Sequence, residues 1–228
     1  MIYLILIIIG STLILCYQIK TDITMKVFII NGGQVFGHSG GRFNATVTKE
    51  TISFFSQQDG VEVQTTNIND VYDPAEEVKK YVWADLIIYH TPIWWFQLPH
   101  GFKKYLDVVF SAGHRNGIYR SDGRSNENPT INYGTGGMLQ GKKYMVTTSW
   151  NAPKEAFTLP GEFFMETSVD QGPLFGFHRM NAFIGLKPLQ SMHFHDVEKN
   201  ADIEQDMLVY KAHLEKLFLP VLPPESIV

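Results

Sequence analysis

From residue 25 onward, short apolar runs alternate with longer segments whose apolar residues recur at helical spacing. The short runs predict strands at 26–31, 61–68, 85–90, 143–150 and 187–196. The amphipathic segments predict helices at 42–58, 74–84, 98–111 and 201–219. In the first of these segments, Phe43, Val47, Ile52 and Phe55 fall roughly on one face. Proline is common in the first turn of a helix, and Pro74 and Pro99 stand where the second and third helices should begin.

Strands that alternate with helices indicate a parallel sheet covered by helices on both faces. Five such units favour an α/β, flavodoxin-like fold, in which a doubly wound five-stranded parallel sheet has the order 2-1-3-4-5. We expect residues 25–228 to form this single domain. Residues 113–141 form a long polar insertion after the third helix, rich in Gly and Asn. Insertions of that length inside a compact domain are usually functional.

Residues 1–24 differ from the rest of the chain. The first 17 residues are apolar except for Gly10, Ser11 and Thr12, and the first charged side chain is Lys20. The segment lacks the basic start and the cleavage site of a secretory signal, and it is short of the roughly 20 apolar residues of a membrane span. Three interpretations stay open: a start codon assigned too early, a membrane anchor and a secretory signal. With an anchor, Lys20 and Lys26 would favour a cytoplasmic catalytic domain, and the membrane would be in contact only through this segment.

Composition narrows the class of protein. The chain has 228 residues, of which 44% are hydrophobic and 18% charged, as in ordinary globular proteins. The net charge of -4, without a basic stripe, argues against a nucleic-acid partner. The single cysteine, Cys16, excludes an intrachain disulfide and suits a reducing, cytoplasmic location. Aromatic residues reach 13%, which is typical of a large core, a dimer interface or a platform for a flat ligand.

The most unusual loops of the chain should meet at one place. In a sheet of this order, ligands bind beyond the carboxyl ends of the strands, at the switch point between the first and third strands. The loop after the first strand is GGQVFGHSGGRFN, and the loop after the third is TPIWWFQLP. The first suits a phosphate, because glycines allow close backbone approach and a helix N-terminus follows. The second offers a stacking surface for a flat ring. Alone, each signal is weak, because glycine turns and buried aromatics are common.

Five blocks together resemble a known family. They are INGGQVFGHSGGRFNATV, YHTPIWWFQLPHGFKKYLDVVF, SDGR, YGTGGMLQGKKYM and SWNAPKEAF, in that order along the chain. This set is similar to the modulator of drug activity B family of flavodoxin-like, FAD-dependent NAD(P)H:quinone oxidoreductases, from about Met25 to about Phe218. Five ordered blocks are far more specific than any one of them.

The resemblance implies site residues for this chain. It places the FAD pyrophosphate on the loop His38, Ser39, Gly40, Gly41, Arg42, Phe43, Asn44, Ala45 and Thr46. It places the isoalloxazine ring against Pro92, Ile93, Trp94, Trp95 and Phe96. It implies further flavin contacts from Tyr133 of the insertion and from Ser149, Trp150, Asn151 and Ala152 after the fourth strand.

The resemblance also implies the activity. NADPH or NADH would pass a hydride to FAD and leave, and a quinone would then be reduced by two electrons to the quinol, in a ping-pong cycle. The family is homodimeric, with its site at the dimer interface. In related mammalian enzymes a Tyr/His pair near the flavin handles charge, but here the matching region reads PKEAFTLPGEFF, so we assign no catalytic residue. The proton donor, the quinone and the preferred nicotinamide stay open.

Other classes compete with this interpretation. A flavodoxin-type electron carrier would be smaller and strongly acidic, and an FMN-dependent azoreductase shares the fold. A metal-binding protein is suggested by HFHD, where His193 and His195 share one face of a strand, but two ligands do not close a site. Arg115, Arg120 and Arg124 of the insertion either meet a phosphate of NADPH or form a solvated face.

Overall fold

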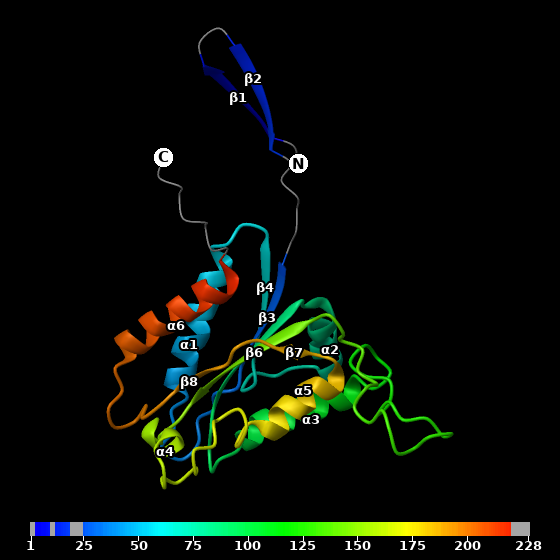
Figure 1. The fold of residues 1–228 in the computed structure, drawn as a ribbon, viewed down its shortest axis with the longest axis vertical. Helices are drawn as coiled ribbons and strands as arrows, with labels where there is room; N and C mark the ends of the chain where they lie inside the picture. The colour runs from blue at the N-terminus through cyan, green and yellow to red at the C-terminus, as the bar shows by residue number, and fades with distance from the viewer. Residues whose placement is uncertain (1–2, 10–11, 19–24, 220–228) are drawn as a thin grey trace.

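The computed structural model describes residues 3–9, 12–18 and 25–219. Its main sheet is parallel and runs in the order β4-β3-β5-β6-β7, with β8 also paired to β6 (Figure 1). Its strands are β3 (Met25–Asn31), β4 (Val61–Asn67), β5 (Leu86–Pro92), β6 (Lys143–Ser149), β7 (Lys187–Pro188) and β8 (Met192–Phe194). The predicted order 2-1-3-4-5 is therefore confirmed. β5 is buried along its whole length, as expected for the central strand.

The edge predicted as one strand at 187–196 is two short strands. Lys187 pairs with Lys143, and Met192 pairs with Thr147. Between these pairs the edge chain spans one residue more than β6 does, as in a β-bulge. A one-residue shift exchanges the faces to which side chains point, so the bulge decides which face His193 occupies.

Two layers of helices cover the sheet. The helices are α1 (Arg42–Ser56), α2 (Pro74–Trp83), α3 (His100–Ala112), α4 (Glu155–Thr158), α5 (Phe175–Ile184) and α6 (Ile203–Phe218). One core cluster joins α1 and α6 to one face of the sheet, and a larger one joins α2, α3 and α5 to the other (Figure 1). The four predicted helices are confirmed to within a few residues. α4 and α5 lie in the stretch 151–186, for which the sequence pattern predicted nothing regular.

The residues at the start of α5 explain why the sequence pattern did not predict this helix. Gly172, Pro173 and Gly176 surround its start and are typical of a loop. The helix is instead held by tertiary contacts: the Tyr89 hydroxyl donates to Asn181 Oδ1 at 3.0 Å, and the Tyr89 and Phe177 rings meet edge to face. The helix ends at Gly185, whose φ of 101° suits a glycine C-cap.

The insertion between α3 and β6 contains turns and isolated bridges. Its fixed point is Ile118, which is fully buried in the larger core and accepts a hydrogen bond from the Met138 N–H at 2.8 Å. Leu139 is also buried. The insertion is thus packed onto the domain at both ends.

Residues near the start of the chain form a separate element. β1 (Tyr3–Ile9) and β2 (Thr12–Gln18) pair antiparallel in a two-stranded sheet. Among the residues that the structure describes, no helix combines the length and apolarity required to span a membrane. The tail 220–228, expected to be irregular, lies outside the described residues.

Candidate functional site

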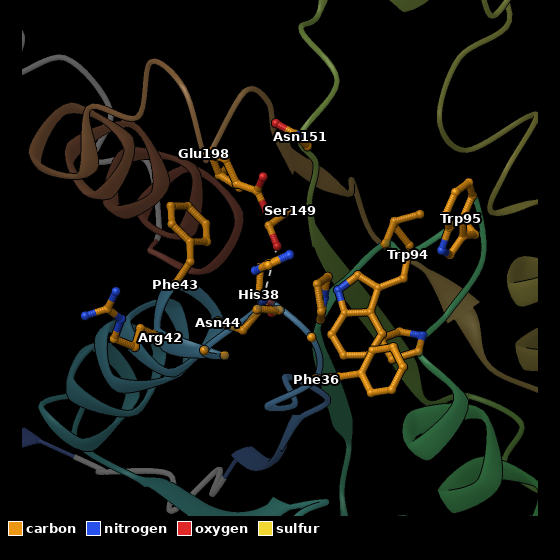
Figure 2. A pocket seen from close by; sticks show the side chains of 18 of the residues that line it. Phe36, His38, Arg42, Phe43, Asn44, Trp94, Trp95, Ser149, Asn151 and Glu198 are labelled. Atoms are coloured by element: carbon orange, nitrogen blue, oxygen red, sulfur yellow. Dashed lines mark hydrogen bonds between the residues drawn. The ribbon is translucent and has the colours of Figure 1, made fainter.

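A cavity of about 680 Å³ lies beyond the carboxyl ends of β3, β5 and β6, at the expected switch point. Thirteen of the nineteen residues predicted to bind the cofactor line it: His38, Ser39, Gly40, Gly41, Arg42, Phe43, Asn44, Pro92, Ile93, Trp94, Trp95, Ser149 and Asn151. Figure 2 shows Arg42 and Phe43 on one side of the cavity and Trp94 and Trp95 on the other. Elements remote in sequence therefore build one site.

The loop before α1 is shaped for an anion. Phe36 and Ser39 exchange backbone hydrogen bonds at 3.0 and 2.9 Å, which closes a tight turn through Gly37 at φ 57°. Gly41, at φ 66°, is the N-cap of α1, and it provides no side-chain cap to the first N–H groups. Residues in the first turn of α1 line the cavity, and none of them is acidic. Uncapped N–H groups and the helix dipole favour a negative group there.

Asn44 ties this loop to the sheet. Its side-chain N–H donates to Ser149 Oγ at 3.1 Å, and both side chains are buried (Figure 2). The close approach needs Gly33, because a Cβ on that residue would lie 2.8 Å from the Cβ of Asn44. The bond fixes the first turn of α1 to the end of β6, 105 residues away.

The opposite side of the cavity is a strained aromatic turn. Trp94 and Gln97 exchange backbone hydrogen bonds at 3.0 Å, so that Trp95 and Phe96 form a two-residue turn. Both have left-handed backbones, with φ of 48° and 63°, which large side chains rarely adopt. Trp94 stacks on Phe36 with ring centroids 5.3 Å apart, while Trp95 is 90% exposed. Strain of this kind concentrates at ligand-binding sites.

Six predicted residues do not line the cavity: Ala45, Thr46, Phe96, Tyr133, Trp150 and Ala152. The Thr46 hydroxyl donates to the Arg42 carbonyl within α1. Trp150 is buried, and its indole N–H donates to Thr148 Oγ1 at 2.7 Å. Tyr133 is exposed and packs against Phe183 of α5.

Seven further residues line the cavity: Phe36, Gly37, Leu98 and Pro99, which belong to the two predicted ligand loops but were not assigned as contacts, and His100, Val197 and Glu198, which lie outside those loops. Phe36 was detectable, since an aromatic residue between glycines of a ligand loop is unusual. Val197 and Glu198 follow β8, whose carboxyl end lies at the same edge of the sheet as β6. Because ligands bind beyond the carboxyl ends of parallel strands, the same reasoning applied to the last strand would have indicated these two residues.

A neutral histidine is buried beneath the cavity. The Thr51 hydroxyl donates to the Val47 carbonyl, so it accepts from the Tyr210 hydroxyl at 2.6 Å and from His90 Nε2 at 2.9 Å. His90 Nδ1 then accepts from the Thr147 hydroxyl at 2.7 Å. Burial lowers the pKa of His90 to about 3, which keeps the imidazole uncharged.

A second polar network joins β6, α5 and β8. The carboxylate oxygen Oδ1 of Asp170 lies 2.9 Å from His178 Nε2 and 3.4 Å from His193 Nε2. The other ring nitrogens meet the hydroxyls of Tyr144, at 2.5 Å, and Thr148, at 2.7 Å. Burial would raise the pKa of Asp170, but the hydrogen bond from His178 and the nearby His193 ring outweigh this effect and hold that pKa well below its usual value.

The two histidines of the HFHD segment therefore have different surroundings. His193 belongs to the Asp170 network, while His195 packs its ring edge-on to Phe157, 5.3 Å away. Burial lowers the pKa of His195. Across the described part of the chain, no group of three or more His, Cys, Asp or Glu side chains is arranged to hold a metal ion. In the insertion, Arg124 forms a salt bridge with Asp122 at 2.7 Å.

Comparison with known proteins identifies the family. A family model described as a flavodoxin-like fold matches residues 25–217. The NADPH:quinone oxidoreductase MdaB of Haemophilus influenzae is 43% identical over 194 residues, which are 85% of this chain and 100% of that protein. The chain therefore belongs to the flavodoxin-like family that this model describes. The resemblance to the modulator of drug activity B group is therefore confirmed.

Two further proteins are similar to this chain over most of its length. An uncharacterised protein of Schizosaccharomyces pombe is 45% identical over 197 residues, covering 85% of this chain and 97% of that protein. A solved structure from Klebsiella pneumoniae, assigned as a quinone reductase, superposes with a TM-score of 0.65 at 21% identity, covering 86% of each chain. At that identity the structural likeness shows the shared fold.

The cavity fits a flavin nucleotide. Its middle combines the uncapped start of α1 with the polar side chains of Asn44, Ser149 and Asn151, and its Trp94 side is flat and aromatic. Its volume lies in the range of cofactor sites. The arrangement can bind a phosphate at the helix start and cover a planar ring between β5 and β6.

Proposed function

We propose that the protein is an NAD(P)H:quinone oxidoreductase that reduces quinones to quinols by two electrons through bound FAD. The observation that carries the proposal is the single cavity that joins an anion-binding helix start to the Trp94 turn at the switch point. The 43% identity to a named NADPH:quinone oxidoreductase over nearly all of that protein supports it.

The extent of the cavity favours FAD over FMN. Beyond the glycine loop, away from Trp94, it continues between Arg42 and Phe43 of α1 and Glu198 after β8 (Figure 2). Val197, next to Glu198, also lines it. An aromatic ring and a carboxylate are suited to an adenine and to ribose hydroxyls, respectively. FMN ends at its phosphate and would leave this half of the cavity to water.

The protein's own residues would orient the flavin ring and exclude water from it. A bound flavin would supply the two-electron transfer between nicotinamide and quinone. Trp94, held by Phe36 and by the turn to Gln97, would fix the plane of the ring and exclude water on one side. Pro92 and Pro99 limit the freedom of the segment between β5 and α3. Ser149 and Asn151 would provide polar contacts at the ring edge.

The assembly we propose is a homodimer. Tyr133 does not line the cavity of its own chain, although the resemblance implies a flavin contact for this residue. A second copy of the chain that places its Tyr133 over this cavity would supply the implied flavin contact. We also propose a cytoplasmic location, NADPH or NADH as the electron donor and residues 25–228 as the reductase domain. Sedimentation equilibrium of the flavin-loaded full chain should give twice the monomer mass, and a monomer would refute the dimer.

An anaerobic NADPH titration of the full chain, reconstituted separately with FAD and FMN, tests the function. We expect FAD to bind more tightly, to bleach with one equivalent of NADPH and to recover when a quinone is added. Parallel lines in double-reciprocal plots would support the ping-pong order. Bound flavin that NADPH leaves oxidised would favour an electron carrier. Equal or better function with FMN, together with azo-dye reduction, would favour an azoreductase.

A further inference from the structure

Three large apolar side chains stand exposed beside the mouth of the cavity. Trp95 is 90% exposed, Phe163 is 69% exposed and Phe96 is 43% exposed. We call this surface, made of Trp95, Phe96 and Phe163, the aromatic shelf. It draws on two segments that are far apart in the sequence, the turn after β5 and the loop after α4. Contiguous exposed apolar surface of this kind usually marks a binding site.

The shelf is continuous with the cavity. Trp95 lines the cavity and Phe96 follows it in the same turn. The rings of Phe96 and Phe163 are stacked, with centroids 5.4 Å apart and planes at 28°. A flat ligand that occupies the cavity therefore has an apolar path leading outward over Phe96 to Phe163.

The base of the shelf is rigid. Phe164 contacts both shelf phenylalanines, with ring centroids 5.7 Å from Phe96 and 5.0 Å from Phe163. Phe164 in turn stacks on Phe157, and both rings meet the buried indole of Trp150 edge to face. A chain of aromatic contacts thus runs from the shelf into the core beneath β6. The shelf needs little reorganisation to receive a ligand.

Unfavourable backbone geometry occurs in both segments that form the shelf. Trp95 and Phe96 have positive φ. The second segment has the same feature, since Met165 and Glu166 lie at φ 50° and 57° in the turn closed by the Thr167 N–H and the Phe164 carbonyl. Because Trp95 is 90% exposed, packing in the core does not offset the conformational cost of its left-handed backbone. Such strain is retained where the exposed surface has a function.

We propose that the aromatic shelf binds the apolar tail of a quinone whose ring is reduced in the cavity, so that the preferred substrates carry an alkyl or isoprenoid chain. The inference rests on the proposed function and adds the class of substrate. A tail that leaves the ring passes over Phe96 and Phe163, where each methylene is removed from water against an aromatic face. A quinone without a tail makes none of these contacts.

The test compares quinones that share one ring and carry a methyl, pentyl or decyl substituent. The variants are Phe163→Ser, the conservative Phe163→Leu, and Leu208→Ser as a control of similar exposure on α6. For the flavin-loaded full chain we expect kcat/KM to rise with tail length. Phe163→Ser should lower kcat/KM for the decyl quinone roughly tenfold and leave the methyl quinone unchanged. Phe163→Leu should recover most of the loss, and Leu208→Ser should match the parent protein.

Three results would overturn the proposal. A kcat/KM independent of tail length in the parent protein would show that the shelf contributes nothing. An equal loss for all three quinones in Phe163→Ser would indicate general damage to the site. Dissociation of an oligomer by Phe163→Ser, seen by sedimentation, would make the shelf an interface between copies of this chain. If the parent protein reduces none of the quinones, the proposed function itself fails, and this result is distinct from the three above.

Discussion

At the scale of single residues, the site depends on a few buried polar contacts that cross the sheet edge. Asn44 and Ser149 join α1 to β6, and His90 joins β5 to α1 and β6 through Thr51 and Thr147. Each group is buried, so losing one partner leaves the other without a hydrogen bond. These residues hold the cavity in shape before any cofactor arrives.

Replacing Asn44 should weaken both stability and flavin binding. In Asn44→Ala, Ser149 Oγ loses its donor and a small cavity opens, which should cost about 1–3 kcal/mol of unfolding free energy. Urea unfolding and a flavin titration measure the two effects. The control is Thr46→Ala in the same helix, whose hydroxyl bonds only to the Arg42 carbonyl and does not line the cavity. Equal flavin affinities of the two variants would contradict the role assigned to Asn44.

His90 should make the protein less stable as the pH falls. The unfolded histidine takes up a proton near its ordinary pKa of 6.5, whereas the folded one does so only near a pKa of about 3. The unfolded state therefore binds more protons between these values, and stability decreases with falling pH across that window. Between pH 7 and 5 the loss should be about 2 kcal/mol. Urea unfolding of His90→Gln should show a shallower pH dependence, and an unchanged slope would refute this assignment.

At the scale of elements, the connection from β5 to α3 is the most specialised part of the fold. Trp94 and Gln97 close a two-residue turn of a type that usually contains Asn or Gly, but here it holds Trp95 and Phe96. Next along the chain, the Gly101 N–H donates to Gln34 Oε1 at 3.0 Å, which joins α3 to the glycine loop. The strain and the cross-link together keep the aromatic turn against the cavity.

Replacing Trp95 by glycine should relieve the backbone strain that an alanine at the same position would keep, and either replacement should weaken flavin binding. Trp95→Gly and Trp95→Ala both remove an indole that is 90% exposed, so they lose similar packing. Only glycine accepts a φ of 48° without penalty, so Trp95→Gly should be more stable than Trp95→Ala by about 1 kcal/mol. Both should bind flavin more weakly than the parent. Thermal unfolding of the pair tests this, and an alanine variant at least as stable as the glycine variant would show that the turn is unstrained.

At the scale of the whole molecule, the two helical layers meet the site from opposite faces of the sheet. α1 provides the anion-binding start from one face, while α3 and the segment around α5 support β5 and β6 from the other. The Asp170 network lies on this second face and joins the loop before α5 to α5, β6 and β8. It holds the edge of the sheet whose following loop contributes Val197 and Glu198 to the cavity.

Removing the charge of Asp170 should loosen this edge in a pH-dependent way. The folded pKa of Asp170 is depressed, so its ionised form contributes stability above its unfolded pKa of about 4, and the contribution is lost as the pH falls below that value. Asp170→Asn should therefore be less stable than the parent at pH 7, with the difference shrinking in acid. Urea unfolding at pH 7 and pH 3.5 measures it. A difference that stays constant would indicate a packing effect.

The sequence by itself determined the sheet order and the location of the site. Apolar runs and amphipathic segments alternate clearly over residues 25–111, and again at 143–150 and 187–219, which leaves few topologies. Because parallel strands end at one edge, the carboxyl ends of β3, β5 and β6 and the segments that follow them had to meet, and together they contribute thirteen of the predicted residues to the cavity. The sheet order and the position of the cavity follow from local sequence patterns and topology rules, because both depend only on the order of elements along the chain.

Only the tertiary structure decided where individual side chains point and how the last third of the domain folds. Trp150 and Phe96 belong to sequence blocks that contact the cavity, yet the first is buried in the core and the second turns onto Phe163. α5 forms around the Tyr89 and Phe177 contact despite its glycines, and a one-residue bulge brings His193 to Thr148. These outcomes depend on packing between distant segments, whose free energies a one-dimensional pattern does not contain.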